Sequence, residues 1–487
     1  MDKKWWTLIA VLSGTFMLLL DVTIVMVAQP EIQGSLRASF SDVQWVLDAY
    51  ALTLAALLLT SGVLADRSGR KRLFAIGLSV FTLGSLLCGM AEDPQMLIAS
   101  RSVQGVGGAI MFAVSIALLG HSFQGRERGV AFGAWGAVAG IATALGPVLG
   151  GLIVTDWSWR GIFLVNVPVG VIALAITIGR VDESKSAEAS HLDWAGFCLL
   201  TAGLVAFVYG LIRAGEHGWT DAVAPGCVAG GAAVLTAFVF TEARIANPMF
   251  DISLLRNRIF CGASIAAFAM NGSLYAILLY LVLYLQDVQH YSALQAGLRI
   301  AIISGGQFVT ATIAGRLSHR VPARWQVGPG LLLVGTGLLV MTGLTGTSSW
   351  THLIAGFIVS GLGAGLVNPP LASTAISVVP PQRAGMASGI NTTFRQVGLA
   401  TGIAVLGSVF APHAAAHTAA AFTAGLDDLM YITAGLALAG GLGAILLLRP
   451  VRLPESAPAT PDEAVMNHVA QTAAPDSKSC ARPDAAS

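Results

Sequence analysis

Two side chains of opposite charge lie inside long apolar stretches in the first quarter of this chain. Asp21 stands within the run from Trp5 to Gln29, and Arg101 stands within a run that begins at about residue 95. Runs of this length match the roughly 20 helical residues that cross a bilayer core. A charge at that depth costs roughly 2.5–3.5 kcal/mol on insertion scales, so such residues usually face a cavity or a partner and often carry protons or ions.

Helix geometry places the two charges at similar depth. Arg101 follows Pro94 by about seven residues, or roughly 10 Å, and Asp21 precedes Gln29 by about eight residues, or roughly 12 Å. Asp48 lies somewhat shallower, and we expect Asp21, Asp48 and Arg101 to form a cluster. A neighbouring arginine favours an ionised carboxylate and desolvation favours the protonated acid, so alternating exposure would load and release a proton. Three alternatives stay open: a static buried ion pair, a helix–helix hydrogen bond from Asp21, and an interfacial Asp48 without a coupling role.

The composition identifies a membrane protein that crosses the bilayer many times. Of 487 residues, 55% are hydrophobic and only 11% are charged, against roughly 25% charged in soluble domains. The net charge of +1 gives no reason to expect a nucleic-acid partner. The five cysteines form no CxxC pair, which indicates neither a disulfide framework nor a zinc site.

Fourteen apolar runs are long enough to span a membrane as helices. They fall at about 5–29, 44–65, 73–91, 95–119, 130–153, 160–179, 194–213, 222–243, 257–286, 292–316, 325–346, 350–378, 383–411 and 429–448. The first run is too long for a signal peptide and contains Asp21, so we expect it to be retained as a helix. Residues 451–487 are rich in Ala, Pro and polar side chains, which predicts a disordered cytoplasmic tail.

The distribution of basic residues predicts the orientation. With the N-terminus in the cytoplasm, most of the 27 Lys and Arg residues fall in cytoplasmic segments, and the opposite side holds only Arg37, Arg160 and Arg213. This asymmetry follows the positive-inside rule and places both termini in the cytoplasm.

Two loops of similar sequence suggest an internal repeat. GVLADRSGR (62–70) follows the second run and AGRLSHRVPAR (314–324) follows the tenth. If these loops are equivalent, residues 1–180 and 255–450 are two six-helix halves, and 181–254 is a linker with two inserted helices. Repeated halves around a central site are a common transporter plan.

Six motifs resemble those of one transporter family. They are GVLADRSGRKRL (62–73), LIASRSVQGVGGA (97–109), GIATALGPVLGG (140–151), LDVTIVMVAQP (20–30), WSWRGIFLVNVPVG (157–170) and GMASGINTTFRQVGLATG (385–402). The chain resembles the major facilitator superfamily, and within it the fourteen-helix drug:proton antiporter branch (EmrB/QacA type). The resemblance implies an all-α polytopic fold of two six-helix halves plus two inserted helices. It also links the first-helix acid and the fourth-helix arginine, here Asp21 and Arg101, to proton coupling.

Two of these motifs carry conformational expectations. The first loop places a carboxylate among basic residues, which can form an ion-pair latch between helix ends; its residues are Gly62, Asp66, Arg67, Gly69, Arg70 and Lys71. The alternative is a simple topology determinant. The fifth-helix motif predicts a kink and close helix packing, and the resemblance implies that it helps to seal the pathway; its residues are Gly146, Pro147, Gly150 and Gly151.

The second half contains no acidic residue inside its apolar runs, and its buried charges are Arg299 and Arg395. Proton coupling is therefore expected in the first half. Candidate residues of a substrate cavity are Asn271, Tyr275, Asn368, Asn391, Arg395 and Gln396, together with Tyr280 and Gln307. Helix–helix hydrogen bonding is the alternative role for each. Asn368 precedes two prolines, which predicts a broken helix at that point.

The sequence therefore predicts a proton-coupled antiporter that exports amphipathic small molecules, such as antibiotics, by alternating access. The alternative is a dedicated exporter of a single endogenous metabolite or natural product; the antiporter-type fifth helix argues against an importer. No GxxxxGK[ST] or HExxH motif occurs, so we expect neither an ATP-driven pump nor an enzyme, and no cofactor or metal. The expected partners are the substrate, protons and the lipid bilayer of a bacterial plasma (inner) membrane. We expect a monomer, and nothing in the sequence indicates a periplasmic adaptor.

Overall fold

A computed structural model describes residues 2–123, 125–185, 193–245, 248, 250–317, 321–379, 384–414, 416 and 418–448. In this part of the chain every regular element is a helix. Helices satisfy all their backbone hydrogen bonds internally, which a segment surrounded by lipid requires. The predicted tail, 451–487, lies outside the described residues.

The first six spans are formed by seven helices. They are α1 (Lys3–Leu36), α2 (Phe40–Ser68), α3 (Arg70–Gly89), α4 (Pro94–Ser122), α5 (Gly125–Asp156), α6 (Gly161–Leu164) and α7 (Asn166–Arg180). Local sequence sets their starts: a capping box of Ser39 and Asp42 opens α2, and Asp93 caps α4 before Pro94 at its first position.

The remaining chain supplies the inserted pair and a second set of spans. Its elements are α8 (Trp194–His217), α9 (Val223–Glu242), α10 (Ser253–Arg256), α11 (Arg258–Met270), η1 (Asn271–Tyr275), α12 (Ala276–Leu283), η2 (Tyr284–Val288), α13 (Ala293–Leu317), α14 (Arg324–Val340), η3 (Trp350–Leu353), α15 (Ile354–Ser377), α16 (Ala384–Ala414) and α17 (Ala419–Leu447). The ninth span runs continuously from α11 to η2.

Thirteen helical segments among the described residues are long and apolar enough to cross a membrane. The remaining predicted span is α14, which has 17 residues and packs against α15 and α17. A helix of about 17 residues lies at the short end of the membrane-spanning range. The all-α, polytopic membrane fold expected from the sequence is confirmed.

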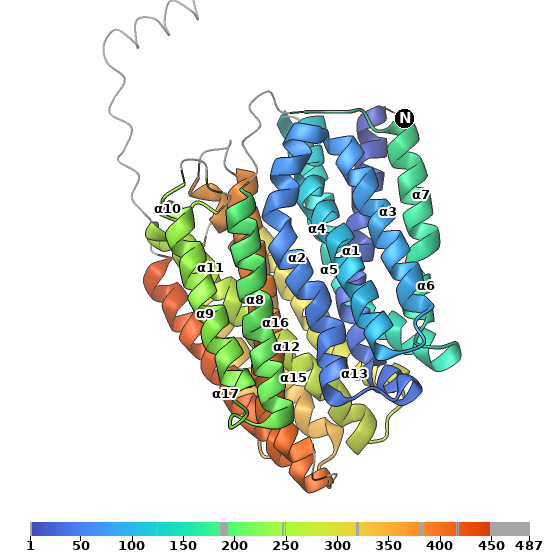
Figure 1. The fold of residues 1–487 in the computed structure, drawn as a ribbon, viewed down its shortest axis with the longest axis vertical. Coiled ribbons are helices and arrows are strands. Elements are labelled where there is room, and N and C mark those ends of the chain that lie inside the picture. Colours follow the sequence, from blue (N-terminus) through green and yellow to red (C-terminus); the bar gives the residue numbers. More distant parts are fainter. Residues whose placement is uncertain are drawn as a thin grey trace, which may run out of the picture. The chain divides into compact units, whose positions relative to one another are not determined.

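The two sets of six spans pack in matching order. In the first set α4 packs on α2 and α3, and α7 packs on α1 and α3; in the second, α15 packs on α13 and α14, and α17 packs on α11 and α14. The sets meet along two seams, α2 with α16 and α5 with α13. The inserted helix α8 packs on α9 and lies along α2 and α16, so it covers the first seam (Figure 1).

The prediction of a helix break at Asn368 is wrong. Helix α15 continues from Ile354 to Ser377 through Pro369 and Pro370. Helices α13 and α14 pack on α15, and such neighbours let a membrane helix tolerate proline. The irregular backbone occurs instead in the ninth span, where η1 and η2 are π-helical turns. Such turns are frequent at functional sites.

Candidate functional site

Asp21 and Arg101 form an ion pair in the interior of the first six spans. Arg101 Nη1 lies 2.5 Å from Asp21 Oδ2, and the two side chains are 1% and 0% exposed. Arg101 Nε donates to the Val46 carbonyl at 3.0 Å, and its guanidinium lies 4.2 Å from the centre of the Tyr50 ring. The pair thus joins α1, α2 and α4 at one buried point.

Three polar side chains that sequence reasoning missed complete the site. Gln104 Nε2 donates to Asp21 Oδ1 at 2.8 Å and to Ser85 Oγ at 2.8 Å, while Gln104 Oε1 accepts from Arg101 Nη1 at 2.5 Å. Asn166 Nδ2 lies 3.4 Å from Asp21 Oδ1. The three-residue spacing from Arg101 to Gln104 puts both on one helix face, which is the signal that identifies Gln104. Both Asp21 oxygens are therefore occupied by donors.

Asp48 does not bond to this pair. Its side chain is 0% exposed, and neither carboxylate oxygen has a hydrogen-bond partner in the described structure. Gln44, one turn earlier on the same face of α2, donates to Tyr280 Oη at 3.3 Å and to the Ile403 carbonyl at 3.1 Å. Asp48 therefore faces the seam between α2 and the second set of spans, whereas Asp21 and Arg101 lie within the first set.

The expected loop at 62–73 is largely helical: α2 continues to Ser68 and α3 begins at Arg70, so Gly69 alone forms the turn between them. Gly69 has φ +108°, and a Cβ there would lie 2.7 Å from the Glu183 carboxylate. Glu183 accepts from the backbone of Lys71 at 3.0 Å and Arg72 at 3.2 Å, an arrangement favoured at a helix N-terminus. Sequence reasoning missed Glu183. The side chain of Asp66 lies outside the described residues, so its part in a latch stays a prediction, and the basic side chain of Arg67 is exposed.

The fifth-helix motif produces close helix contacts. A Cβ on Gly150 would lie 2.9 Å from the Ile24 carbonyl of α1, and a Cβ on Gly151 would lie 2.6 Å from the Ala293 carbonyl of α13. Gly146 lies against Thr23 in the same way, and Pro147 approaches Gly297 of α13. Helix α5 continues through Pro147. These residues let α5 pack at backbone distance on both neighbours.

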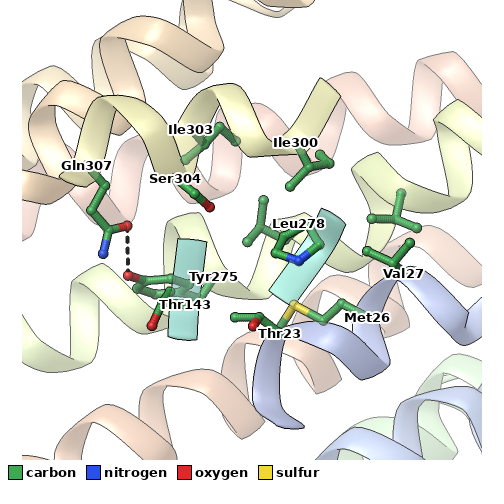
Figure 2. A pocket seen from close by; sticks show the side chains of 12 residues that line it. Thr23, Met26, Val27, Thr143, Tyr275, Leu278, Ile300, Ile303, Ser304 and Gln307 are labelled. Carbon is green, nitrogen blue, oxygen red and sulfur yellow. Dashed lines mark hydrogen bonds between the residues drawn. The ribbon is translucent and has the colours of Figure 1, made fainter. Parts of the chain in front are cut away.

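A small cavity lies between the two sets of spans. It holds about 20 Å³, enough for roughly one water molecule. Figure 2 shows side chains from α1, α5, the ninth span and α13 around it; the lining residues are Thr23, Met26, Val27, Thr143, Pro147, Tyr275, Leu278, Val282, Ile300, Ile303, Ser304 and Gln307. Tyr275 Oη donates to Gln307 Oε1 at 3.1 Å across this space (Figure 2).

The candidate substrate residues divide into two groups. Asn368 Nδ2 donates to Tyr275 Oη at 3.2 Å, and Arg395 Nη1 donates to Asn368 Oδ1 at 3.0 Å, so these three extend the cavity network. Asn391 donates to the Ala263 carbonyl at 3.3 Å and Asn271 donates within its own helix. Gln396 is half-buried, and Tyr280 is bonded at the α2–α16 seam to the Ile403 carbonyl.

Comparisons place this architecture in a known family. A model described as Major Facilitator Superfamily matches residues 11–403. The chain is 37% identical over 406 residues to the multidrug resistance protein Stp of Mycobacterium tuberculosis, covering 83% of this chain and 75% of that protein. It is 35% identical over 422 residues to the puromycin resistance protein pur8 of Streptomyces alboniger, covering 86% and 84%.

Two further matches agree with this assignment. The methylenomycin A resistance protein of Streptomyces coelicolor is 34% identical over 448 residues, covering 91% of this chain and 92% of that protein. The crystal structure of the human organic anion transporter MFSD10 (TETRAN) superposes with a TM-score of 0.64 at 17% identity, covering 91% and 99%, which shows the shared fold. From its two sets of six spans, its motifs and these matches, the chain belongs to the major facilitator superfamily.

Proposed function

We propose that this protein is a proton-coupled antiporter that exports amphipathic small molecules, including antibiotics, across the bacterial plasma membrane. The observation that carries the proposal is the fully buried Asp21–Arg101 pair, because Asp21 lies on α1 and α1 also lines the cavity between the two sets of spans. Relatives that share 34–37% identity are named as multidrug or antibiotic resistance proteins, which supports drug export.

The protonation state of Asp21 gives α1 two arrangements relative to α4. An ionised Asp21 accepts from Arg101, Gln104 and Asn166. A protonated Asp21 loses its attraction for Arg101, and leaving one charge of a buried pair without its partner costs about 3–5 kcal/mol. That cost favours a rearrangement of α1 against α4. A proton taken up from outside and released inside would drive the cycle.

The same helix connects the proton site to the substrate. Thr23, Met26 and Val27 follow Asp21 within two turns of α1 and line the central cavity. Movement of α1 on protonation therefore changes the cavity walls. Because α5 packs on α1 at Gly146 and Gly150 and on α13 at Gly151, the motion reaches the second set of spans. Alternating access by rocking of two halves requires such a connection.

The transmembrane orientation belongs to the same proposal. We place both termini in the cytoplasm, with residues 1–180 and 255–450 as the two halves, 181–254 as the linker with its inserted helices, and a monomer as the working unit. Asp48 is a second proton-binding candidate, and the 62–73 loop, anchored to Glu183, is the cytoplasmic latch. The dedicated export of one natural product remains the second candidate, since several relatives are named for a single antibiotic.

Transport in proteoliposomes tests the proposal. A pH gradient is imposed across vesicles that contain the purified full chain, and movement of ethidium and of structurally unrelated antibiotics is followed. We expect gradient-driven movement of several compounds in the wild type and in the control Glu92→Gln, whose exposed carboxylate lies on the outer loop after α3. Movement of a single compound supports the dedicated exporter. No gradient-driven movement of any compound would contradict the proposal.

A further inference from the structure

Arg395 is an intramembrane cation that has no carboxylate partner among the residues that the structure describes. We propose that the transported molecules include amphipathic acids, and that Arg395 binds their ionised acidic group. This inference rests on the export function proposed above and names a substrate class for it. It is carried by the contrast between three arginines that lie within the membrane spans.

The other two intramembrane arginines are stabilised by a carboxylate or by aromatic rings. Arg101 pairs with Asp21 at 2.5 Å. Arg299 lies near the outer end of α13, where its guanidinium stacks 3.6 Å from the centre of the Tyr291 ring and 4.6 Å from that of Trp350. An aromatic face stabilises a cation without neutralising it. These contacts stabilise both guanidinium cations within the membrane spans.

Arg395 has only neutral partners among the described residues. It donates to Asn368 Oδ1 at 3.0 Å and approaches Asn391 Oδ1 at 3.5 Å. It is the twelfth residue of α16 (Ala384–Ala414), so it lies roughly 16 Å from the cytoplasmic end of that helix. A cation at such depth is costly, and these residues typically mark substrate or ion pathways.

The surroundings of Arg395 point it toward the transport path. Its partner Asn368 is bonded to Tyr275, and Tyr275 lines the central cavity opposite Thr143 and Thr23. Arg395 keeps part of its surface accessible although it lies deep in the span. The hydrogen bonds from Gln307 through Tyr275 and Asn368 thus connect the cavity wall to Arg395. Those of Arg395 within the described structure use its Nε and Nη1 atoms, which leaves Nη2 for a ligand.

Charge at the cavity favours an anion. The Asp21 and Arg101 charges cancel each other. The acidic residues of the second set of spans, Asp287 in η2 and Asp427 and Asp428 in the first third of α17, are not among the residues that line the cavity. Asp48 faces the seam at α2 and does not line the cavity, whereas Arg395 is linked to the cavity-lining Tyr275 through Asn368. Guanidinium binds carboxylates and similar oxyanions through two parallel hydrogen bonds, which makes it a selective partner for a planar acid.

This assignment predicts an electrical signature. When an anion leaves the cell and protons enter, both movements carry charge in the same direction at any stoichiometry. An inside-negative potential therefore drives export of an acid more strongly than export of its neutral analogue. The comparison needs no knowledge of the natural substrate.

A matched acid and neutral compound test the inference. The probes are 2-hydroxy-1,4-naphthoquinone, which is ionised at pH 7, and its neutral methyl ether. Binding to the detergent-solubilised full chain is measured for wild type, Arg395→Lys, Arg395→Gln and the control Arg299→Gln. We expect Arg395→Gln to weaken binding of the acid by about ten- to hundredfold and to leave the ether unchanged. Arg395→Lys should retain part of the affinity, and Arg299→Gln should resemble the wild type.

The outcomes separate this inference from the proposed function. Equal loss for acid and ether in Arg395→Gln, or no preference of the wild type for the acid, would overturn the role of Arg395. Gradient-driven transport of ethidium that persists in such a case would leave the export function standing. Failure of all gradient-driven transport, with acid binding still dependent on Arg395, would instead reject the export function and retain the anion site. If Arg395→Gln does not fold, the acid-to-ether affinity ratio in Arg395→Lys decides.

Discussion

Gln104 donates to Asp21 through the same amide group that bonds Ser85, with both distances 2.8 Å. Its carbonyl oxygen meanwhile accepts from Arg101. One neutral side chain therefore fixes the positions of both members of the ion pair and connects them to α3. Together with the contacts to α2 and α7, the pair is held among five helices, α1, α2, α3, α4 and α7.

Substitution of Gln104 by Leu should destabilise the protein. The change removes two donor contacts and two acceptor contacts, from Arg101 and from Cys88, in a fully buried site. An unsatisfied buried group costs about 1–3 kcal/mol, more when it is charged. We expect a lower thermal unfolding midpoint in detergent and slower gradient-driven transport. Gln33→Leu, at the partly exposed C-terminal end of α1, is the control and should leave both unchanged. Wild-type stability in Gln104→Leu would show that the frame is not needed.

Loss of Arg101 should be more costly than loss of an exposed ion pair. Arg101→Met leaves Asp21 buried without its countercharge, which costs about 3–5 kcal/mol. The double variant Asp21→Asn/Arg101→Met should recover much of that stability. The matched control is Asp182→Asn, which breaks the exposed pair with Lys3 at 2.7 Å and should have little effect. Thermal unfolding in detergent compares the wild type, the single variants Asp21→Asn and Arg101→Met, the double variant and the control. Losses that add in the double variant would contradict a direct interaction.

The close contacts of α5 predict that Gly→Ala substitutions at different positions of this helix have very different effects on transport. Gly151→Ala places a Cβ against the α13 backbone, whereas Gly133→Ala and Gly136→Ala meet no atom within 4 Å. We expect Gly151→Ala to abolish transport or reduce the folded yield, and the two controls to retain full activity. Transport per folded protein in proteoliposomes is the measurement. Equal activity of all three variants would contradict a sealing role for the fifth-helix motif at 140–151.

Substitutions at two glycines of the 62–73 motif should differ in their effect on stability, because Gly62 lies within α2 and Gly69 forms the turn after it. Gly69 has φ +108° and lies against Glu183, so Gly69→Ala adds backbone strain of about 1–3 kcal/mol. Gly62 has no neighbouring atom within 4 Å of its Cβ position, so Gly62→Ala should be tolerated. Thermal unfolding and transport rate compare the two. Loss of stability or transport in Gly62→Ala but not in Gly69→Ala would contradict the assignment of the strained position to Gly69.

Substitution of Asp48 should reduce transport without reducing stability. Its carboxylate is buried without a hydrogen-bond partner in the described structure, so Asp48→Asn removes an ionisable group that contributes no bond. We expect an unchanged or higher unfolding midpoint together with reduced proton-driven transport. Preserved transport would assign proton coupling to Asp21 alone.

The sequence predicted the elements well and the supporting contacts poorly. Fourteen spans follow from apolar length and charge distribution, and the pairing of Asp21 with Arg101 follows from similar depth. The same reasoning wrongly added Asp48 to this cluster, because depth does not tell which way a side chain on α2 faces. Gln104 was detectable from its helix-face spacing, but Ser85 and Asn166 depend on how α3 and α7 pack, which no local pattern encodes. Glu183 was missed because its role depends on a loop folding back onto α3. The intact α15 shows that neighbouring helices can override a local proline signal.

The most direct test of proton coupling through Asp21 compares two modes of transport in one preparation. Proteoliposomes with wild type or Asp21→Asn are assayed for substrate accumulation under a pH gradient and for substrate exchange without a gradient. Exchange needs alternating access but no net proton movement. We predict that Asp21→Asn loses gradient-driven accumulation and retains exchange. Gradient-driven accumulation at the wild-type rate in Asp21→Asn would contradict the central claim.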